Sequence, residues 1–163
     1  IEILAPPLAA SWSAIACMSA TSSCTRATAG FQTASISAMA RSGVLAIGAC
    51  VFGAQGAVGI DIAPAAVPVT TANALANGVA SRVGVSTTDL ADLDGTYDLV
   101  VANILAPALI ALSADLLRVL APGGSLVISG ILAEAHAHVL SALAPLRVVA
   151  TDELDGWVAV TLR

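Results

Sequence analysis

The sequence predicts an α/β fold in which a mostly parallel, doubly wound sheet is covered by helices on both faces. From Gly43 onward, short apolar runs of strand length alternate with longer segments of helical character, a pattern typical of parallel sheets with helical crossovers. Residues 99–102 are apolar throughout, as expected for a strand buried on both faces. A short DELDG turn joins the last two expected strands, so we expect an antiparallel pair at one edge.

Turn and capping residues set the expected limits of these elements. Gly53 and the pair Asn77-Gly78 are typical helix stops, and Pro64 suits a helix start. Pro68 is tolerated only in a first helical turn. The expected helices are 44–52, 65–76, 107–120 and 133–143, with an APGG turn at 121–124 after the third. The expected strands are 33–38, 57–62, 82–86, 99–102, 125–129, 146–151 and 157–162, with a polar loop at 89–95.

Composition narrows the class of protein. A chain of 163 residues with 58% hydrophobic and 10% charged residues is long enough for one core and too apolar for disorder. A net charge of −5 argues against a nucleic-acid partner. Cys17, Cys24 and Cys50 match no metal or redox spacing and suit a reducing, cytoplasmic compartment.

The mean hydropathy of +0.93 raises the question of a membrane segment. The most apolar window, residues 44–60, has 17 residues and contains Gln55 and four glycines, whereas a spanning helix needs about 20 apolar residues. No basic region precedes an apolar core near the first residue, so we expect neither a membrane anchor nor a signal peptide.

The first 40 residues differ in chemistry from the rest. They are rich in Ala, Ser, Thr and Cys, and their apolar residues follow no sustained helical or strand period. Ten of the eleven acidic residues lie from Asp61 onward, and Glu2 is the other. So sharp a change within a globular domain calls for an explanation.

Two polar residues stand where strands of the expected sheet end. Asp61 ends the second strand, where an acid in nucleotide-binding α/β folds accepts hydrogen bonds from ribose hydroxyls. The alternative is a charge that stabilises a helix N-terminus near Pro64. Asn103 ends the fourth strand, where its amide can bind a substrate amine or a cofactor. The alternative is a cap for the helix near Pro107.

Other polar groups carry weaker signals. His136 and His138 lie two apart on an expected helix, so they point to different faces, and we interpret both as solvated. Asp89, Asp92 and Asp94 are mostly solvated charges in a loop, although one could reach an adenine amino group. Ser129 and Gly130 have no GxSxG context and no nucleophile spacing. A dinucleotide or adenosyl cofactor needs a glycine-rich turn after the first strand, and Gly43 alone stands there.

Six segments together resemble one known family. They are SGVLAI (42–47), GIDI (59–62), NGV (77–79), YDLVVANILAPAL (97–109), LAPGGSLVISGILAE (120–134) and DGWVAV (155–160). They resemble, in order and spacing, the catalytic domain of the PrmA-type methyltransferases, which trimethylate protein eleven of the large ribosomal subunit. The combination of ANILA, PGG and SGIL is specific to this family, whereas GIDI alone is not.

The resemblance implies a Rossmann-like class I methyltransferase fold with a seven-stranded sheet and S-adenosylmethionine as cofactor. Asp61 would hold the cofactor ribose, Gly43 would be the last glycine of a G-x-G-x-G loop, and Asn103 would bind cofactor and lie beside the transferred methyl group and the incoming amine. The reaction would be an in-line transfer from the sulfonium to a deprotonated amine, without a metal. The protein substrate would be ribosomal large-subunit protein eleven, with no direct contact to nucleic acid.

The chain also departs from the family pattern. Met39 and Arg41 stand where the other two loop glycines are expected, Ser37 replaces an acid at the end of the first strand, and Ala63 replaces an acid after GIDI. The family's Gly/Thr-rich segment before the first strand and its N-terminal substrate-recognition domain have no counterpart. We therefore divide the chain into an aberrant or poorly ordered segment, 1–41, and a methyltransferase domain, 42–163.

These departures leave the activity open. One hypothesis is that residues from about 4 to 41 are translated out of frame between two compensating indels. The distance from the opening IEI to Ser42-Gly43 is about what the family shows, whereas the residues between them do not match the family pattern. The alternative is divergence into a pseudoenzyme. Three classes of function follow: a methyltransferase domain with impaired activity, a non-catalytic Rossmann-like remnant that binds a partner, and a small membrane-associated protein.

Overall fold

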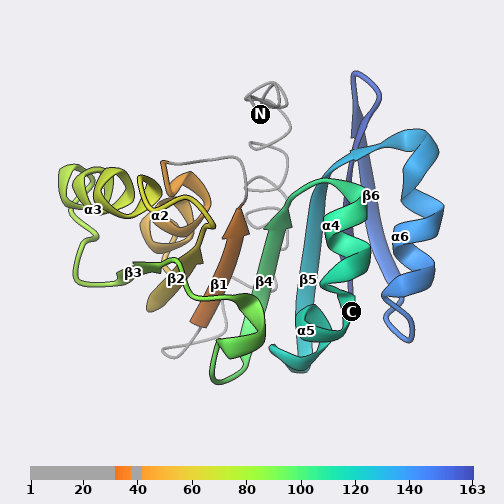
Figure 1. Ribbon diagram of the computed structural model, residues 1–163, viewed down its shortest axis with the longest axis horizontal. Helices are drawn as coiled ribbons and strands as arrows, with labels where there is room; N and C mark the ends of the chain where they lie inside the picture. Colours follow the sequence, from red (N-terminus) through yellow and green to blue (C-terminus); the bar gives the residue numbers. More distant parts are fainter. Residues whose placement is uncertain (1–31, 38–41) are drawn as a thin grey trace.

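One sheet organises the part of the chain that the structure describes. The computed structural model describes residues 42–163 and the backbone of 32–37. Seven strands lie in the order β3-β2-β1-β4-β5-β7-β6 (Figure 1). All neighbouring pairs from β3 to β5 are parallel, and β7 runs antiparallel to both β5 and β6. The predicted mostly parallel sheet with an antiparallel edge pair is confirmed.

The elements alternate along the chain as predicted from Gly43 onward. The strands are β1 (Gln32–Ser37), β2 (Gly56–Ile60), β3 (Val83–Ser86), β4 (Tyr97–Asn103), β5 (Leu120–Leu132), β6 (Val148–Leu154) and β7 (Trp157–Leu162). The helices are α2 (Val44–Val51), α3 (Ala66–Ala76), α4 (Ala106–Ala111), α5 (Ser113–Arg118) and α6 (His136–Ala142), with short 3₁₀ turns η1 (Leu90–Asp92) and η2 (Ala133–Ala135).

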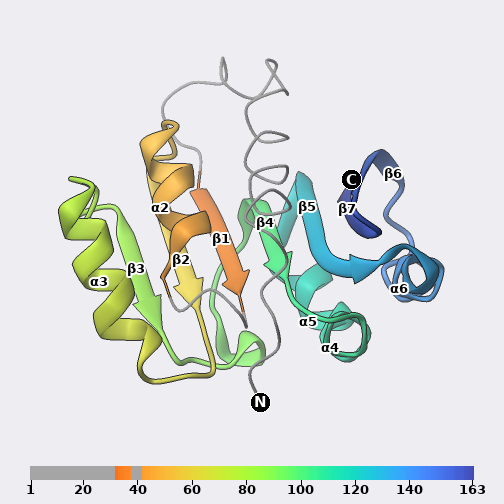
Figure 2. The ribbon, with the colours of Figure 1, turned by 90° about the horizontal axis from the view of Figure 1, so that it is seen from above.

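Helices cover both faces of the sheet (Figure 2). Alternate residues of β4 point to opposite faces. On one face Leu99 and Val101 pack with Leu45 of α2. On the other, Val100 and Ala102 join the largest apolar cluster, which includes Leu109 of α4, Leu116 of α5 and Val139 of α6. Except for Asp98, every residue of β4 is buried, as its apolar run predicts.

Two expectations about the segment after β4 are wrong. The single helix expected over 107–120 is split at Leu112 into α4 and α5. Leu109 and Leu116, seven residues apart, are both fully buried, so each short helix contributes one anchor to the core. The APGG segment is part of β5 and does not end a helix. The pairing of β5 with β4 is irregular here. Leu120 pairs with Tyr97 and Ser125 with Leu99, so more residues of β5 than of β4 lie between these two pairs.

Several turns behave as the sequence predicts. Gly78 follows α3 with a φ of 70°, and Gly53 follows α2 with a φ of 109°. Pro68 is the third residue of α3 and therefore lies in its first turn, where its missing N–H costs nothing. Asp155 and Gly156 have φ values of 51° and 78°, typical of the tight turns that join antiparallel strands.

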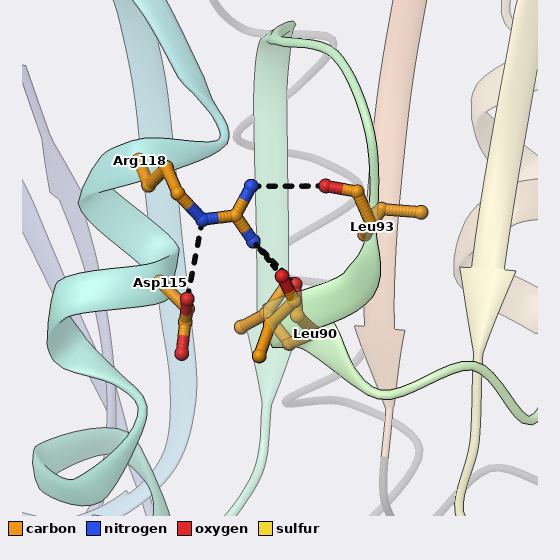
Figure 3. Close-up of polar contacts among 5 residues, drawn as sticks. Leu90, Leu93, Asp115 and Arg118 are labelled. Atoms are coloured by element: carbon orange, nitrogen blue, oxygen red, sulfur yellow. Dashed lines mark hydrogen bonds and ion pairs between the residues drawn. The ribbon is translucent and has the colours of Figure 1, made fainter.

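Arg118 ties the η1 turn to α5 (Figure 3). Its guanidinium donates to the carbonyl oxygens of Leu90 at 2.6 Å, Ala91 at 3.0 Å and Leu93 at 3.0 Å. Its Nε also donates to Asp115 at 3.2 Å. One planar side chain with five donors thus fixes the connection between β3 and β4.

Arg82 and Cys50 connect the end of α2 to the start of β3. Arg82 donates to the carbonyl oxygens of Cys50 at 2.9 Å and Ala54 at 3.0 Å. The Cys50 thiol lies 3.6 Å from the Arg82 carbonyl oxygen. Burial raises the pKa of this thiol above its usual 9.0, and the Arg82 charge partly opposes that shift.

None of the helices in residues 42–163 combines the length and apolar character that crossing a membrane requires. Within the same residues, no group of three His, Cys, Asp or Glu side chains could hold a metal ion.

Candidate functional site

The candidate residues gather at one edge of the sheet, where its winding reverses. β1 and β4 are neighbours, yet α2, which follows β1, covers one face, and α4, which follows β4, covers the other. Ligands of open α/β sheets bind outside the carboxyl ends of the strands at such a switch point. Asn103 ends β4, Gly43 lies between β1 and α2, and Asp61 directly follows β2. The fold therefore brings the three predicted residues to three adjacent strand ends.

Asp61 presents one carboxylate oxygen that has no partner among the described residues. Its Oδ1 accepts a hydrogen bond from the Ala63 amide at 2.8 Å, and its own amide donates to the Ser86 carbonyl at 3.2 Å. These bonds fix the carboxylate, whereas Oδ2 is buried and accepts no hydrogen bond from any described residue. The alternative role, a charge near the helix N-terminus, stays a prediction, since Asp61 lies five residues before Ala66, the first residue of α3.

Asn103 is the second residue with an unsatisfied oxygen. It is 4% exposed, and its Oδ1 is buried with no hydrogen-bond partner in the described part of the chain. Leaving such an acceptor unpaired costs about 1–3 kcal/mol, and exceptions of this kind call for a functional or solvent explanation. The capping alternative is wrong, since Leu105 is the N-cap of α4 and no side chain caps that helix.

Gly43 begins α2 in a conformation that favours glycine. Its φ is 67°, and its carbonyl accepts from the Ile47 amide at 2.9 Å as the helix starts. A Cβ at this position would lie 2.2 Å from Cγ2 of Thr70. Asn73, also on α3, donates to the Ser42 carbonyl at 3.0 Å. The close approach of α3 thus requires glycine here, as the predicted cofactor loop does.

Two residues at this edge were not among the predicted site residues. Thr70 is 2% exposed and packs on Gly43. The feature of the sequence that could have identified Thr70 is its spacing of four from Ala66 and Ala74, which together form the buried face of α3. Gly130 lies next to Asn103 and has a φ of 81°. The feature of the sequence that could have identified Gly130 is a glycine just after the apolar run of β5.

The weaker candidates lie elsewhere or outside the described residues. His138 is exposed, as predicted, and His136 is half-buried, with Nδ1 close to the Ala133 carbonyl oxygen. Asp89, Asp92 and Asp94 are exposed around η1. Met39 and Arg41, the departures in the predicted cofactor loop, lie outside the described residues, as does most of the segment 1–41.

The described residues also line a cavity of about 370 Å³ at the opposite ends of the strands. Gly56 and Tyr97, the first residues of β2 and β4, are among its lining residues. It is therefore separate from the edge that carries Asp61 and Asn103.

Solved structures share this architecture. A ribosomal protein L11 methylase from Lactobacillus delbrueckii subsp. bulgaricus aligns with a TM-score of 0.76 and 30% identity, over 85% of this chain and 72% of that one. An RNA methyltransferase from Salinibacter ruber, in complex with S-adenosyl-L-homocysteine, aligns with a TM-score of 0.70 and 20% identity, over 98% of this chain and 92% of that one. The fold is that of the Rossmann-like methyltransferases.

The sequence comparisons narrow this class to one family. The family model described as ribosomal protein L11 methyltransferase (PrmA) matches residues 20–163, and the chain belongs to that family. The L11 methyltransferase of Geobacter sp. (strain M21) is 45% identical over 122 residues, 75% of this chain. That of Pelotomaculum thermopropionicum is 44% identical over 125 residues. The chain spans about 40% of the length of these curated relatives.

Proposed function

We propose that this chain is the catalytic domain of an S-adenosylmethionine-dependent methyltransferase that modifies amino groups of ribosomal protein L11. The observation that carries the proposal is a pair of buried oxygens, on Asp61 and Asn103, that have no hydrogen-bond partner in the described part of the chain. The two residues lie at the carboxyl ends of β2 and β4. Both oxygens are acceptors, and both residues lie at the edge of the sheet where ligands of this fold class bind. Membership of the family supports the substrate.

The residues present fit this cofactor. Oδ2 of Asp61, which accepts no hydrogen bond within residues 42–163, would accept one from a ribose hydroxyl. Glycine at position 43 lets Thr70 of α3 pack closely against the start of α2, and so helps to hold the N-terminus of α2 at this edge of the sheet. When bound, S-adenosylmethionine supplies a methyl group on a positively charged sulfur.

Asn103 would orient the acceptor. Its Oδ1, to which no described residue donates a hydrogen bond, would accept one from the incoming amine and hold the nitrogen lone pair toward the methyl carbon. The work of such a site is positioning, which can contribute about 7–11 kcal/mol to lowering a barrier. The described site residues supply no covalent nucleophile for this reaction and none is required.

We further propose that cofactor binding is weakened at the loop before α2. In the sequence, Met39 and Arg41 stand where the family has glycines, so their side chains would take the space that the cofactor needs. Arg41 would also bring a positive charge toward a cationic cofactor. A non-catalytic member of the family is the second candidate function, and the same two residues favour it.

Calorimetric titration separates these functions. We expect weak binding of S-adenosylmethionine by the chain as it stands. The double variant Met39→Gly, Arg41→Gly should bind at least about tenfold more tightly, which corresponds to about 1.4 kcal/mol. Because S-adenosylhomocysteine lacks the positive sulfur, Arg41→Gly alone should improve its binding less than that of S-adenosylmethionine.

Asp61→Asn in the double variant is the matched control, since it should remove the gained affinity. Methyl transfer to purified L11 by the double variant supports the enzymatic function. If neither the chain nor the double variant binds either ligand, the assignment of this edge as a cofactor site is wrong. If the double variant binds but does not methylate L11, the substrate assignment is wrong.

A further inference from the structure

The bulge in β5 lies directly against Asn103. Ile128 pairs with Val160 and Ile131 with Val158, so Ser129 and Gly130 together face the single residue Ala159 of β7. Such an insertion of one residue is a β-bulge, a feature that re-aims side chains and is frequent next to functional sites. The bulge occurs at the register position where Ser129 pairs with Asn103 on the other side of β5.

Gly130 occupies this bulge with no room for a side chain. Its φ of 81° lies in the region that favours glycine. A Cβ built on Gly130 would lie 2.9 Å from Oδ1 of Asn103 and 3.1 Å from the carbonyl oxygen of Ile104. The first distance is shorter than real contacts of this kind, so one of the two groups would have to move.

The Asn103 amide is the group that would move. The Ile104 backbone is held by a hydrogen bond of 3.2 Å from its amide to the Ser129 carbonyl, and its side chain is 2% exposed. Oδ1 of Asn103, in contrast, has no hydrogen bond to a described residue that would hold it in place. The missing side chain at Gly130 therefore leaves the space beside which this Oδ1 lies, and any side chain there would displace the amide.

We propose that Gly130 is a positioning residue for Asn103: at the bulge in β5 its missing side chain leaves the space that Oδ1 needs to keep its direction. This inference rests on the proposed function for the role of Asn103. The position of the amide itself is measurable without cofactor or substrate, so the two proposals can fail separately.

The test is the side-chain amide spectrum of the ¹⁵N-labelled chain. Three asparagines and two glutamines give five NH₂ pairs, and Asn103→Ala identifies the Asn103 pair by its loss. We expect Gly130→Ala to shift this pair. The matched control is Gly123→Ala, also in β5, where φ is 78° and no atom lies within 4 Å of the added Cβ. It carries similar backbone strain without the contact, so the Asn103 pair should not shift. An unchanged pair in Gly130→Ala, or an equal shift in Gly123→Ala, overturns the proposal.

A double-mutant comparison covers the case in which Gly130→Ala folds poorly. In the Asn103→Ala background the close Oδ1 contact is absent, so Gly130→Ala should lower the midpoint of thermal unfolding less than it does in the parent chain. Equal losses in both backgrounds, or a double variant that stays unfolded where Asn103→Ala folds, overturn the proposal. In a chain with methyl-transfer activity, Gly130→Ala should lower kcat by about tenfold or more while KM for the cofactor stays near its parent value.

Discussion

Replacing Gly43 with alanine tests whether the start of α2 depends on glycine because of the approach of α3. The added methyl group meets two separate obstacles. At a φ of 67° a residue with a Cβ is strained by about 1–2 kcal/mol. The Cβ would also lie 2.2 Å from Cγ2 of the buried Thr70, and overpacking of this kind costs about 1–3 kcal/mol. We therefore expect Gly43→Ala to lower the free energy of unfolding by about 2–5 kcal/mol.

The matched control for this change is Gly78→Ala. Gly78 has nearly the same φ, 70°, at the end of α3, and no atom lies within 4 Å of an added Cβ. Gly78→Ala should therefore lower the free energy of unfolding only by the backbone strain, about 1–2 kcal/mol. In both variants the added methyl group restricts the unfolded chain to a similar extent. The difference between their losses in free energy of unfolding therefore measures the contact with Thr70.

Urea unfolding followed by circular dichroism gives the magnitude. With a slope of about 2 kcal/mol per molar urea, the midpoint should fall by about 1–2.5 M for Gly43→Ala and by about 0.5–1 M for Gly78→Ala. In a Thr70→Ala background, which removes Cγ2, the loss caused by Gly43→Ala should shrink. Equal shifts for the two glycines, or no change in the Thr70→Ala background, would refute the packing explanation.

Three further outcomes are expected. Arg118→Ala should lower the free energy of unfolding by about 1.5–3 kcal/mol, because carbonyl oxygens of the η1 turn lose a charged donor. Asp115→Ala should cost less than about 1 kcal/mol, since its pair with Arg118 is partly exposed, and urea unfolding compares the two. Burial raises the pKa of the Cys50 thiol above 9.0, so the folded state holds this proton more tightly than the unfolded state. The free energy of unfolding should therefore fall as the pH rises above about 9, and Cys50→Ala should reduce that fall. Burial also raises the pKa of Tyr97 above 10.0, so the comparison is made below the pH at which Tyr97 adds its own effect. Asn103→Leu, similar in shape and without the unpaired oxygen, should leave thermal stability unchanged or higher while methyl transfer by any active form is lost. A marked drop in the unfolding midpoint would contradict this account of Oδ1.

The sequence was sufficient for the features that depend on local pattern. The apolar run ending in Asn103 predicted a buried strand with a polar residue at its end, and the structure confirms both. Asp61 was likewise correctly predicted at the end of a strand, because strand length and the following proline are local signals. The pair Asn77-Gly78 predicted the end of α3, since a positive φ at that point requires a residue such as glycine.

What the sequence could not supply depends on contacts between distant segments. The break between α4 and α5 falls at Leu112, between Ala111 and Ser113, where no proline or glycine marks it. The contact of Thr70 with Gly43 joins residues of different helices, and the bulge at Gly130 depends on the register between β5 and β7. These are properties of packing and pairing, which no single segment encodes.

The central place of β1 affects the order in which the sheet can form during synthesis. Of the described strands β1 is made first, yet its partners β2 and β4 follow later in the chain, and Ser35 meets Val101 only across a long intervening segment. At about 5–20 residues per second, that segment takes roughly 3–13 s to emerge. During this time one side of β1 has no strand to pair with. The four strands β4 to β7, in contrast, are contiguous in the chain and pair with one another. We therefore expect that half of the sheet to assemble as a unit and β1 to complete its pairing when β4 arrives.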